Sequence, residues 1–221
     1  MKNIKNHKFI TIEGVDGAGK STALPFIEKF LQERGEEYII TREPGGTPFG
    51  EKMREIVRES NDISVLTETM IMFTARAEHI NKIIKPALDA GKWVICDRFT
   101  DSTFAYQSMA KGLPETKVKA LEKVVQDDVI PGLTLVFDVP VSVSRSRLKK
   151  TGKEPDKFER ENDGFFQKVI DGYKQIVKNY PSRCKMIDAT IAMEERDKNI
   201  HFYLEEFYNS FDNKTKVKNN I

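Results

Sequence analysis

Cysteine, histidine and tryptophan are scarce in this chain, and their scarcity excludes several kinds of site. The 221 residues contain two cysteines, three histidines and one tryptophan. Cys96 and Cys184 both lie within apolar, strand-like runs, which favours two reduced, buried thiols over a disulfide or a metal site. The three histidines are dispersed along the sequence and form no ligand pattern. We therefore expect neither a disulfide scaffold nor a Cys/His metal centre.

Long apolar runs and an excess of charge of one sign are also lacking. No apolar stretch approaches the roughly 20 residues that a membrane-spanning helix needs. The N-terminal MKNIKNHKFI does not have the apolar core of a secretory signal. The 36 basic and 34 acidic residues leave a formal net charge of +2, which is too small to indicate nucleic-acid binding. We expect a cytoplasmic protein that binds neither membranes nor nucleic acids.

Five short, β-rich runs alternate with stretches of helical periodicity. The runs cover residues 8–14, 37–43, 92–98, 133–139 and 184–189. After the first run, Leu24, Ile27 and Leu31 follow a helical spacing, and Gly35 is suited to end that helix. Such alternation predicts an α/β fold with a parallel sheet and helices on both faces. No linker divides the chain, so we predict one domain over residues 1–221, with a polar, basic tail from about residue 210.

A glycine-rich segment follows the first predicted strand and opens the first predicted helix. It reads Gly14-Val15-Asp16-Gly17-Ala18-Gly19-Lys20-Ser21 and fits the phosphate-loop pattern G-x-x-x-x-G-K-[ST]. Backbone N–H groups and the helix N-terminus would bind the nucleotide phosphates. Lys20 would reach the β- and γ-phosphates, the Ser21 hydroxyl would hold Mg²⁺, and Thr22 would start the helix. The segment therefore predicts nucleotide binding.

The loop alone leaves the reaction open. A GTPase needs a guanine-reading N-K-x-D, and the nearest string, NKTK at residues 213–216, lacks the aspartate. An energy-coupling ATPase and a P-loop switch with little catalysis stay open as alternatives. A kinase needs a second anion-binding site, which unpaired arginines would form.

Four further segments contain such arginines, in a fixed order. They read TREPGGTPFGEKMR (41–54), MIMFTARAEH (70–79), CDRFTDSTFAYQ (96–107) and DKFERENDGFFQKVIDGY (156–173). Together with the phosphate loop, they closely resemble the bacterial thymidylate kinase family, whose members make dTDP from dTMP and ATP. The resemblance extends over about residues 8–207. It implies a P-loop, three-layer fold with a five-stranded parallel sheet, a mobile lid over about residues 147–162, dependence on Mg²⁺ and a homodimer.

The resemblance also assigns roles to individual residues. Arg54, Arg76 and Arg98 match the arginines that hold the acceptor phosphate, and Asp97 matches the acid that supports Mg²⁺. Asp16 matches the loop carboxylate that accepts a hydrogen bond from the 3′-hydroxyl of the acceptor. Further positions match the acceptor pocket or, in one case, the ATP site: Glu43, Pro44, Met72, Thr103, Tyr106 and Gln107 for dTMP, and Arg147 for ATP.

The chemistry explains why arginines recur. The acceptor is a phosphate oxygen that is already anionic near pH 7, so the reaction needs no strong general base. The difficulty is to bring two polyanions together and to stabilise the transferring group. A guanidinium makes bidentate contacts with phosphate that an ammonium cannot reproduce. Lys20, Arg98, Asp16 and one lid cation, Lys157, are the expected catalytic groups.

Two regions depart from the family pattern. The lid reads Asp156-Lys157-Phe158-Glu159 where many members have D-R-[IFL]-E, so Lys157 is expected to replace an arginine, with Lys153 and Arg160 as alternatives. In the base pocket, the residue that usually stacks on thymine is Met72, and Arg58 takes a position often filled by leucine. We expect dTMP as the acceptor, with weakened discrimination against dUMP. A dUMP kinase or a broader pyrimidine deoxynucleotide kinase is the alternative.

Overall fold

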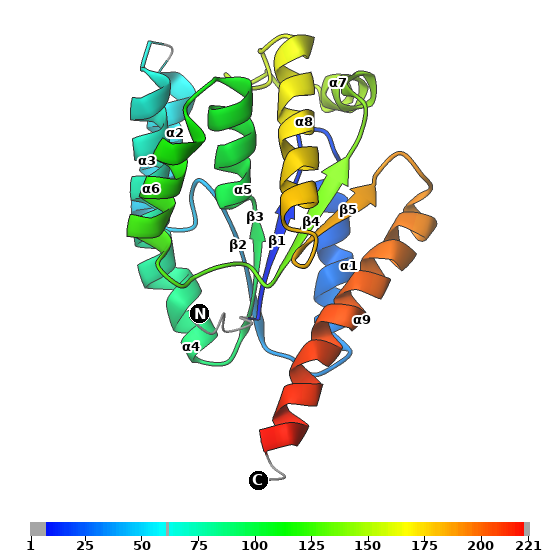
Figure 1. The fold of residues 1–221 in the computed structure, drawn as a ribbon. Helices are drawn as coiled ribbons and strands as arrows, with labels where there is room; N and C mark the ends of the chain where they lie inside the picture. The colour runs from blue at the N-terminus through cyan, green and yellow to red at the C-terminus, as the bar shows by residue number, and fades with distance from the viewer. Residues whose placement is uncertain (1–7, 61, 219–221) are drawn as a thin grey trace.

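The computed structural model describes the backbone of residues 8–60 and 62–218, and the side chains of residues 8–60 and 62–211. Five strands form one parallel sheet in the order β2-β3-β1-β4-β5 (Figure 1). The strands are β1 (Phe9–Glu13), β2 (Tyr38–Arg42), β3 (Trp93–Asp97), β4 (Leu133–Asp138) and β5 (Cys184–Asp188). Each end lies within one residue of the predicted bounds, so the predicted α/β fold with a five-stranded parallel sheet is confirmed.

Burial explains why the strands are so regular. Every residue of the central strand β1 is buried, because helices cover both faces of the sheet. A strand that is buried on both faces needs a continuous apolar run and no alternation of polar residues. The edge strand β2 is only half-buried, and its sequence YIITR is correspondingly more polar.

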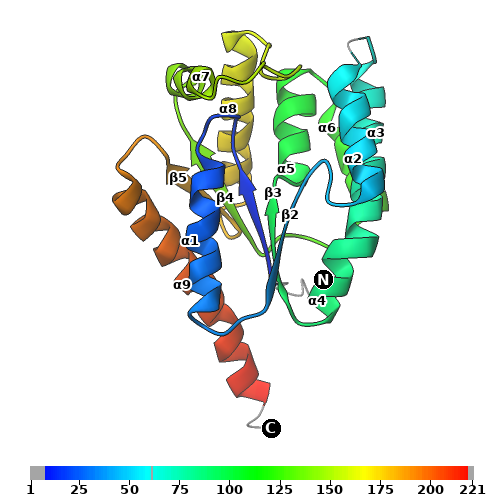
Figure 2. The same ribbon diagram turned by 180° about the vertical axis from the view of Figure 1, so that it is seen from behind.

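Helices cover both faces of the sheet and one of its sides. α1 (Lys20–Gln32) and α9 (Met193–Lys218) lie on one face, whereas α5 (Thr100–Thr103) and α8 (Asp163–Asn179) lie on the other (Figures 1 and 2). The helices α2 (Pro48–Glu59), α3 (Val65–His79), α4 (Lys85–Asp89) and α6 (Glu115–Gln126) group together on the β2 side. Two π-helical turns, η1 (Ile80–Ile84) and η2 (Phe104–Ala110), extend α3 and α5. Among the described helices, none is both long and apolar enough to cross a bilayer.

The first helix shows both the strength and the limit of periodicity. Ile27 and Leu31 are buried as predicted, Leu24 packs at the margin of the same core, and Gly35 lies past the helix end with φ 66°. The helix begins at Lys20, two residues before the predicted start at Thr22. Gly19 explains the earlier start, because its φ of 95° ends the loop immediately before Lys20.

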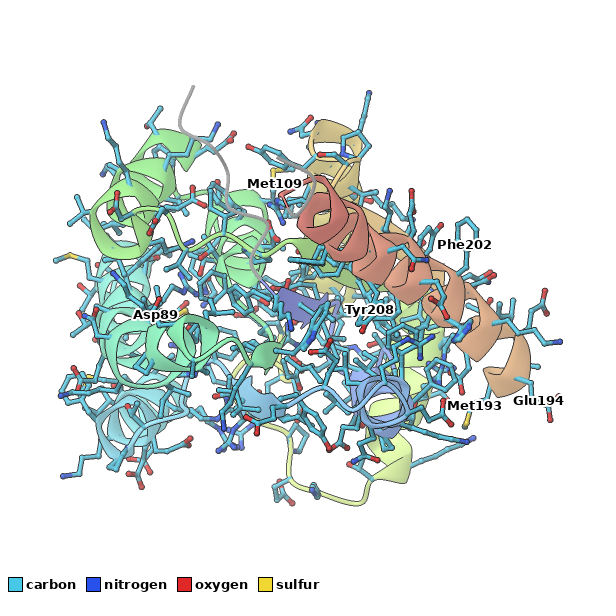
Figure 3. The ribbon with its side chains drawn as sticks, turned by 90° about the horizontal axis from the view of Figure 1, so that it is seen from below. Asp89, Met109, Met193, Glu194, Phe202 and Tyr208 are labelled. Atoms are coloured by element: carbon cyan, nitrogen blue, oxygen red, sulfur yellow. The ribbon has the colours of Figure 1, made fainter. Side chains whose placement is uncertain are left out.

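The predicted lid and the predicted tail both begin inside a helix. α7 (Val141–Lys150) ends inside the predicted lid, and residues 151–162 form turns and irregular backbone before α8. The predicted tail from about residue 210 continues α9 to Lys218, and residues 219–221 lie outside the described residues. Seen from below, Tyr208 of α9 points toward the sheet, whereas Met193 and Phe202 lie on the outer side of the helix (Figure 3). Tyr208 stacks on Trp93 with ring centroids 5.8 Å apart, which attaches α9 to β3.

Candidate active site

The phosphate loop joins β1 to α1 and depends on its glycines. Gly14, Gly17 and Gly19 all have positive φ. A Cβ atom on Gly14 would lie 2.6 Å from the Phe137 carbonyl oxygen, and one on Gly17 would lie 2.6 Å from that of Ser144. The loop backbone is therefore packed against β4 and α7 too closely for any side chain at these positions.

Lys20 is buried beneath this loop. Its Nζ atom donates hydrogen bonds to the carbonyl oxygens of Gly14 at 3.0 Å and Val15 at 3.1 Å. Burial lowers the pKa of Lys20, and the positive charge of Arg98 lowers it further. Desolvation makes the ammonium group more responsive to an added negative charge, such as a nucleotide phosphate.

Two arginines contact the loop from outside. Arg147 on α7 donates to the carbonyl oxygens of Ala18 at 3.2 Å and Ala189 at 2.7 Å. Arg196 on α9 is also buried and donates to the Thr22 hydroxyl at 2.8 Å. The predicted ATP-site residue Arg147 thus lies beside the loop. Sequence reasoning missed Arg196, because a single arginine within a charged stretch of the last helix carries no distinguishing signal.

Asp16 faces away from the loop and pairs with Arg98. Asp16 Oδ1 lies 2.6 Å from Arg98 Nη2, and Asp16 Oδ2 accepts a hydrogen bond from the Tyr106 hydroxyl at 3.2 Å. Burial raises the pKa of Asp16, but the charges of Arg98 and Lys20 outweigh this effect and lower the pKa to about 2. The carboxylate therefore stays ionised within a loop that has the phosphate-binding pattern.

Arg98 follows β3 and has an unusual backbone conformation. Its φ of 70° places a non-glycine residue in the left-handed region, while its N–H group continues the sheet by donating to the Ile12 carbonyl oxygen at 2.9 Å. Backbone strain of this kind is common at functional positions. The conformation brings the guanidinium group within hydrogen-bond distance of Asp16, Tyr106, Ser102 and Tyr173.

Arg76 on α3 occupies a second buried position. Its Nε atom donates to Glu43 Oε2 at 2.7 Å, and its Nη2 atom donates to the Thr103 hydroxyl at 3.2 Å. Glu43 is in turn held by His79, with Nδ1 and Oε1 2.9 Å apart. Within the described part of the chain, Arg76 Nη1 is buried without a hydrogen-bond partner. A buried donor without an acceptor destabilises the fold, unless a bound ligand accepts its hydrogen bond.

Arg54 on α2 completes the cationic wall. Its Nη1 atom donates to the Pro44 carbonyl oxygen at 3.0 Å. Burial lowers the pKa of Arg54, as do the positive charges of Arg42, Arg58 and Arg98. Mutual repulsion among guanidinium groups is relieved when an anion binds between them.

These side chains surround one cavity at the carboxyl ends of β1, β2 and β3. The cavity is lined by Asp16, Glu43, Pro44, Arg54, Val57, Arg58, Met72, Arg76, Arg98, Phe99, Ser102, Thr103, Tyr106, Gln107, Asp156 and Phe158. All ten residues predicted for the acceptor site are among them. Sequence reasoning missed Val57, Phe99 and Ser102, for which no motif distinguishes a lining residue from a core residue. Four guanidinium groups face three carboxylates here, which suits an anionic ligand.

Asp97 is the candidate metal-supporting residue. Among the described residues, Asp97 Oδ1 is one of three buried side-chain atoms without a hydrogen-bond partner. Ser21, the other predicted ligand, is exposed at the start of α1. No group of three or more histidine, cysteine or acidic residues that could hold a metal occurs in the described ranges. A single hydroxyl and one unpaired carboxylate oxygen fit Mg²⁺, which keeps several waters and binds substrate phosphates directly.

The predicted lid cation lies elsewhere. Lys157 Nζ donates to Glu68 Oε2 and to the Ser60 carbonyl oxygen, both at 2.8 Å, outside the acceptor cavity. Its neighbours in sequence, Asp156 and Phe158, do line that cavity. Of the alternatives, Arg160 donates to the Pro155 carbonyl oxygen within the lid. The lid therefore contributes an anion and an aromatic ring to the cavity, while its lysine attaches it to α3.

A glycine-rich loop at the carboxyl end of a parallel strand, beside an arginine-lined cavity, is the arrangement of a P-loop nucleotide-binding protein with a second anion site. The sequence profile of the thymidylate kinase family matches residues 12–200. The chain belongs to the thymidylate kinase family.

Individual relatives agree with this assignment. The chain is 45% identical over 202 residues to a thymidylate kinase of Nitrosomonas europaea, covering 91% of this chain and 94% of the relative. It is 48% identical over 200 residues to that of Methylobacillus flagellatus, covering 90% and 98%. The crystal structure of thymidylate kinase from Ehrlichia chaffeensis superposes with a TM-score of 0.73 at 33% identity, covering 89% and 97%. The family predicted from the sequence is confirmed.

Proposed function

We propose that this chain transfers the γ-phosphoryl group of ATP to the phosphate of dTMP, giving ADP and dTDP. The carrying observation is the 2.6 Å ion pair between Asp16 of the phosphate loop and Arg98 of the acceptor cavity. This pair joins the two anion sites directly, so that a donor phosphate on the loop would face an acceptor phosphate at Arg98. The relatives named thymidylate kinase support the same reaction.

The contacts suggest a division of labour. Arg98 and Lys20 would neutralise the transferring group, since Lys20 is buried beneath the loop and the half-buried Arg98 lies where the two sites meet. Arg54 would hold the acceptor phosphate. The Nε and Nη2 atoms of Arg76 donate to Glu43 and Thr103, so Nη1 is the nitrogen that would donate to the acceptor nucleotide. Asp16 would accept a hydrogen bond from the 3′-hydroxyl.

Ser21 and Asp97 would hold Mg²⁺ together with the nucleotide phosphates. When bound, Mg²⁺ supplies charge neutralisation and fixes the geometry of the phosphates. Asp97 suits this role because it is the last residue of β3, immediately before Arg98. The backbone of β3 thereby sets the distance between the metal-supporting carboxylate and the phosphate-binding guanidinium group.

Acceptor choice would be relaxed toward dUMP. Met72 and Arg58 both line the cavity, and Arg58 also pairs with the lid residue Asp156 at 3.6 Å. In an apolar pocket one methyl group contributes only about 1–3 kcal/mol of discrimination. A flexible methionine and an arginine paired with the lid would distinguish dTMP from dUMP by less free energy than a stacked aromatic ring would.

A homodimer is the assembly that the exposed apolar surface supports. α2 and α3 pack against each other and leave four large apolar side chains exposed: Phe49, Ile56, Leu66 and Met70. Two adjacent helices that expose such side chains are typical of an interface between copies of one chain.

Acceptor-dependent ADP formation tests the reaction. Purified protein is supplied with ATP and Mg²⁺, and ADP is measured with dTMP, dUMP, dCMP, dGMP or no acceptor. We expect turnover with dTMP, slower turnover with dUMP, and little ADP without an acceptor. ADP formation that is independent of the acceptor would contradict a kinase. A dTMP to dUMP ratio of kcat/KM equal to that of a relative with an aromatic residue at position 72 would contradict the relaxed choice alone.

A further inference from the structure

Glu13, the last residue of β1, is a buried carboxyl group directly behind the acceptor site. Its exposed fraction is 0%. Glu13 Oε1 accepts a hydrogen bond from the Phe99 N–H at 2.7 Å. Glu13 Oε2 accepts from the hydroxyls of Ser102 at 2.5 Å and Tyr173 at 2.9 Å. Glu13 does not line the cavity itself, and it is joined to two residues that do, Phe99 and Ser102.

The two hydroxyls also bind Arg98. Arg98 Nη1 donates to Ser102 Oγ and to the Tyr173 oxygen, at 3.2 Å in each case. Ser102 lines the acceptor cavity, whereas Tyr173 on α8 is buried. Glu13 therefore lies one hydroxyl away from the guanidinium group that we assign to the transferring phosphoryl group.

The three oxygen atoms form a closed triangle. Ser102 Oγ and the Tyr173 oxygen lie 2.8 Å apart, so all three sides have hydrogen-bond length. Three hydrogen bonds need three hydrogens, and the two hydroxyls supply only two. An ionised Glu13 would leave one side as two facing lone pairs. The triangle is complete only when the carboxyl group carries the third proton.

We propose that Glu13 is a proton-binding positioning residue for Arg98, neutral when the acceptor phosphate is bound and ionised more readily when it is not. The inference rests on the proposed dTMP site. An ionised Glu13 would place a second negative charge beside Arg98, which Asp16 already neutralises, and would oppose a phosphate at the same guanidinium group. Binding of an anionic acceptor and protonation of Glu13 therefore favour each other. The proton enters from the buffer through Ser102, which borders the cavity.

The surroundings place this proton exchange near neutral pH. Burial and the charge of Asp101 raise the pKa of Glu13 to about 7, against the lowering effects of Ser102 and Arg98. The charged and titratable groups that face Glu13 are Asp101 on α5, Arg98 after β3, Cys96 on β3, Lys20 on α1, Tyr173 on α8 and Cys184 on β5. Asp101 is held as part of a bidentate pair with Arg183, which fixes its position.

Calorimetric binding of dTMP without ATP measures the coupling without turnover. Titrations at pH 7.5 in two buffers with different ionisation enthalpies give the number of protons taken up. A tenfold effect of Glu13 charge on affinity corresponds to one pH unit, so the wild-type protein should take up roughly half a proton more than Glu13→Gln. The wild-type Kd should also weaken roughly tenfold, relative to the variant, between pH 6 and 8.5. Taking the difference between the two proteins removes the titration of the dTMP phosphate, which both share.

Matched variants separate the triangle from general effects. Glu122→Gln makes the same change at a half-buried carboxyl group on α6, whose pKa burial and Asp101 also raise, and should retain wild-type proton uptake. Thymidine, which has no phosphate, should cause no Glu13-dependent uptake. If Glu13→Gln does not fold, Tyr173→Phe opens the triangle by removing one hydroxyl and should likewise reduce the uptake.

The inference would be overturned by equal proton numbers in wild type and Glu13→Gln, or by wild-type uptake in Tyr173→Phe. A loss of uptake in Glu122→Gln would assign the proton to another group and would also overturn it. Failure of the proposed function looks different, because the wild-type protein would then not bind dTMP. Binding of dTMP with no proton uptake linked to Glu13 would contradict this inference alone.

Discussion

Asp16 is a carboxylate that the fold keeps ionised, and this has a measurable effect on stability. Its pKa is lowered from 3.8 to about 2 in the folded protein, because the charges of Arg98 and Lys20 outweigh the effect of burial. A group of this kind stabilises the fold above the unfolded pKa, and the stabilisation is lost as the pH falls through the folded value. Between pH 4 and pH 2, urea unfolding should therefore show a steeper loss of stability in the wild type than in Asp16→Asn. Equal slopes would contradict the ion pair.

Arg98 provides the strictest test of residue chemistry in the site. Arg98→Lys retains the charge but removes the planar fork that reaches Asp16, Ser102, Tyr106 and Tyr173. Each lost hydrogen bond to a charged group is worth about 1.5–3 kcal/mol, so we expect kcat with dTMP to fall at least tenfold. Arg42→Lys is the matched control, because Arg42 is exposed and forms its ion pair with Glu51 outside the acceptor cavity. Unchanged kcat in Arg98→Lys would remove Arg98 from the mechanism.

Among the elements, the phosphate loop has a shape that close packing restricts at particular glycines. Gly17 and Gly35 both have positive φ, but a Cβ atom on Gly17 would lie 2.6 Å from the Ser144 carbonyl oxygen, whereas one on Gly35 would have no atom within 4 Å. We expect Gly17→Ala to raise the KM for ATP more than tenfold. Gly35→Ala should cost about 1 kcal/mol of stability and leave that KM unchanged. Similar ATP kinetics in the two variants would show that loop packing does not control ATP binding.

The contacts of the lid suggest a specific role for its lysine. Lys157 attaches the lid to α3 through Glu68, which also accepts hydrogen bonds from Lys111 and Gln107. This pairing favours a docking role over the catalytic role expected from the family pattern. We predict that Lys157→Ala raises the KM for dTMP severalfold, because Asp156 and Phe158 lose their anchor, and changes kcat less than threefold.

Steady-state kinetics with Lys153→Ala as the control would decide between these roles for the lid lysine. Lys153 lies in the same irregular segment, and it is exposed. Its variant should behave as the wild type. A large loss of kcat in Lys157→Ala with unchanged KM would instead restore the catalytic role.

Some elements could be predicted from the sequence and others could not, and the difference has a physical reason. The inner strands β1, β3 and β4 are almost entirely buried and so are rich in apolar residues, and the less buried edge strands β2 and β5 still contain enough apolar residues to be found from the sequence. The phosphate loop and the acceptor arginines were found because their chemistry demands particular residues at particular spacings. Glu13, Tyr173 and Arg196 were not, because their importance arises from contacts between segments up to 174 positions apart, such as the one between Arg196 and Thr22. Lys157 was assigned by its neighbours in sequence, whereas its position depends on Glu68.

At the scale of the whole molecule, one helix connects the acceptor site to the outer surface. The inner side of α3 carries Met72 and Arg76, which line the cavity, whereas Met70 on the same helix is 51% exposed. Neighbouring α2 carries Arg54 on the cavity side and Ile56, 43% exposed, on the outside. Packing of a second copy against α2 and α3 would therefore restrain two helices that hold acceptor-site arginines.

Assembly can be tested at Met70. Met70→Glu would place a charge in the apolar surface of α2 and α3 and should convert a dimer to a monomer, as measured by size-exclusion chromatography with light scattering. Met193→Glu is the matched control, because Met193 is 58% exposed on α9, on the other side of the molecule from α2 and α3, and should leave the dimer intact. Since α3 also carries Arg76, the Met70→Glu monomer should show a raised KM for dTMP and an unchanged KM for ATP. A monomeric wild-type protein would contradict the proposed dimer. A monomeric Met70→Glu variant with unaltered dTMP kinetics would show that assembly does not affect acceptor binding.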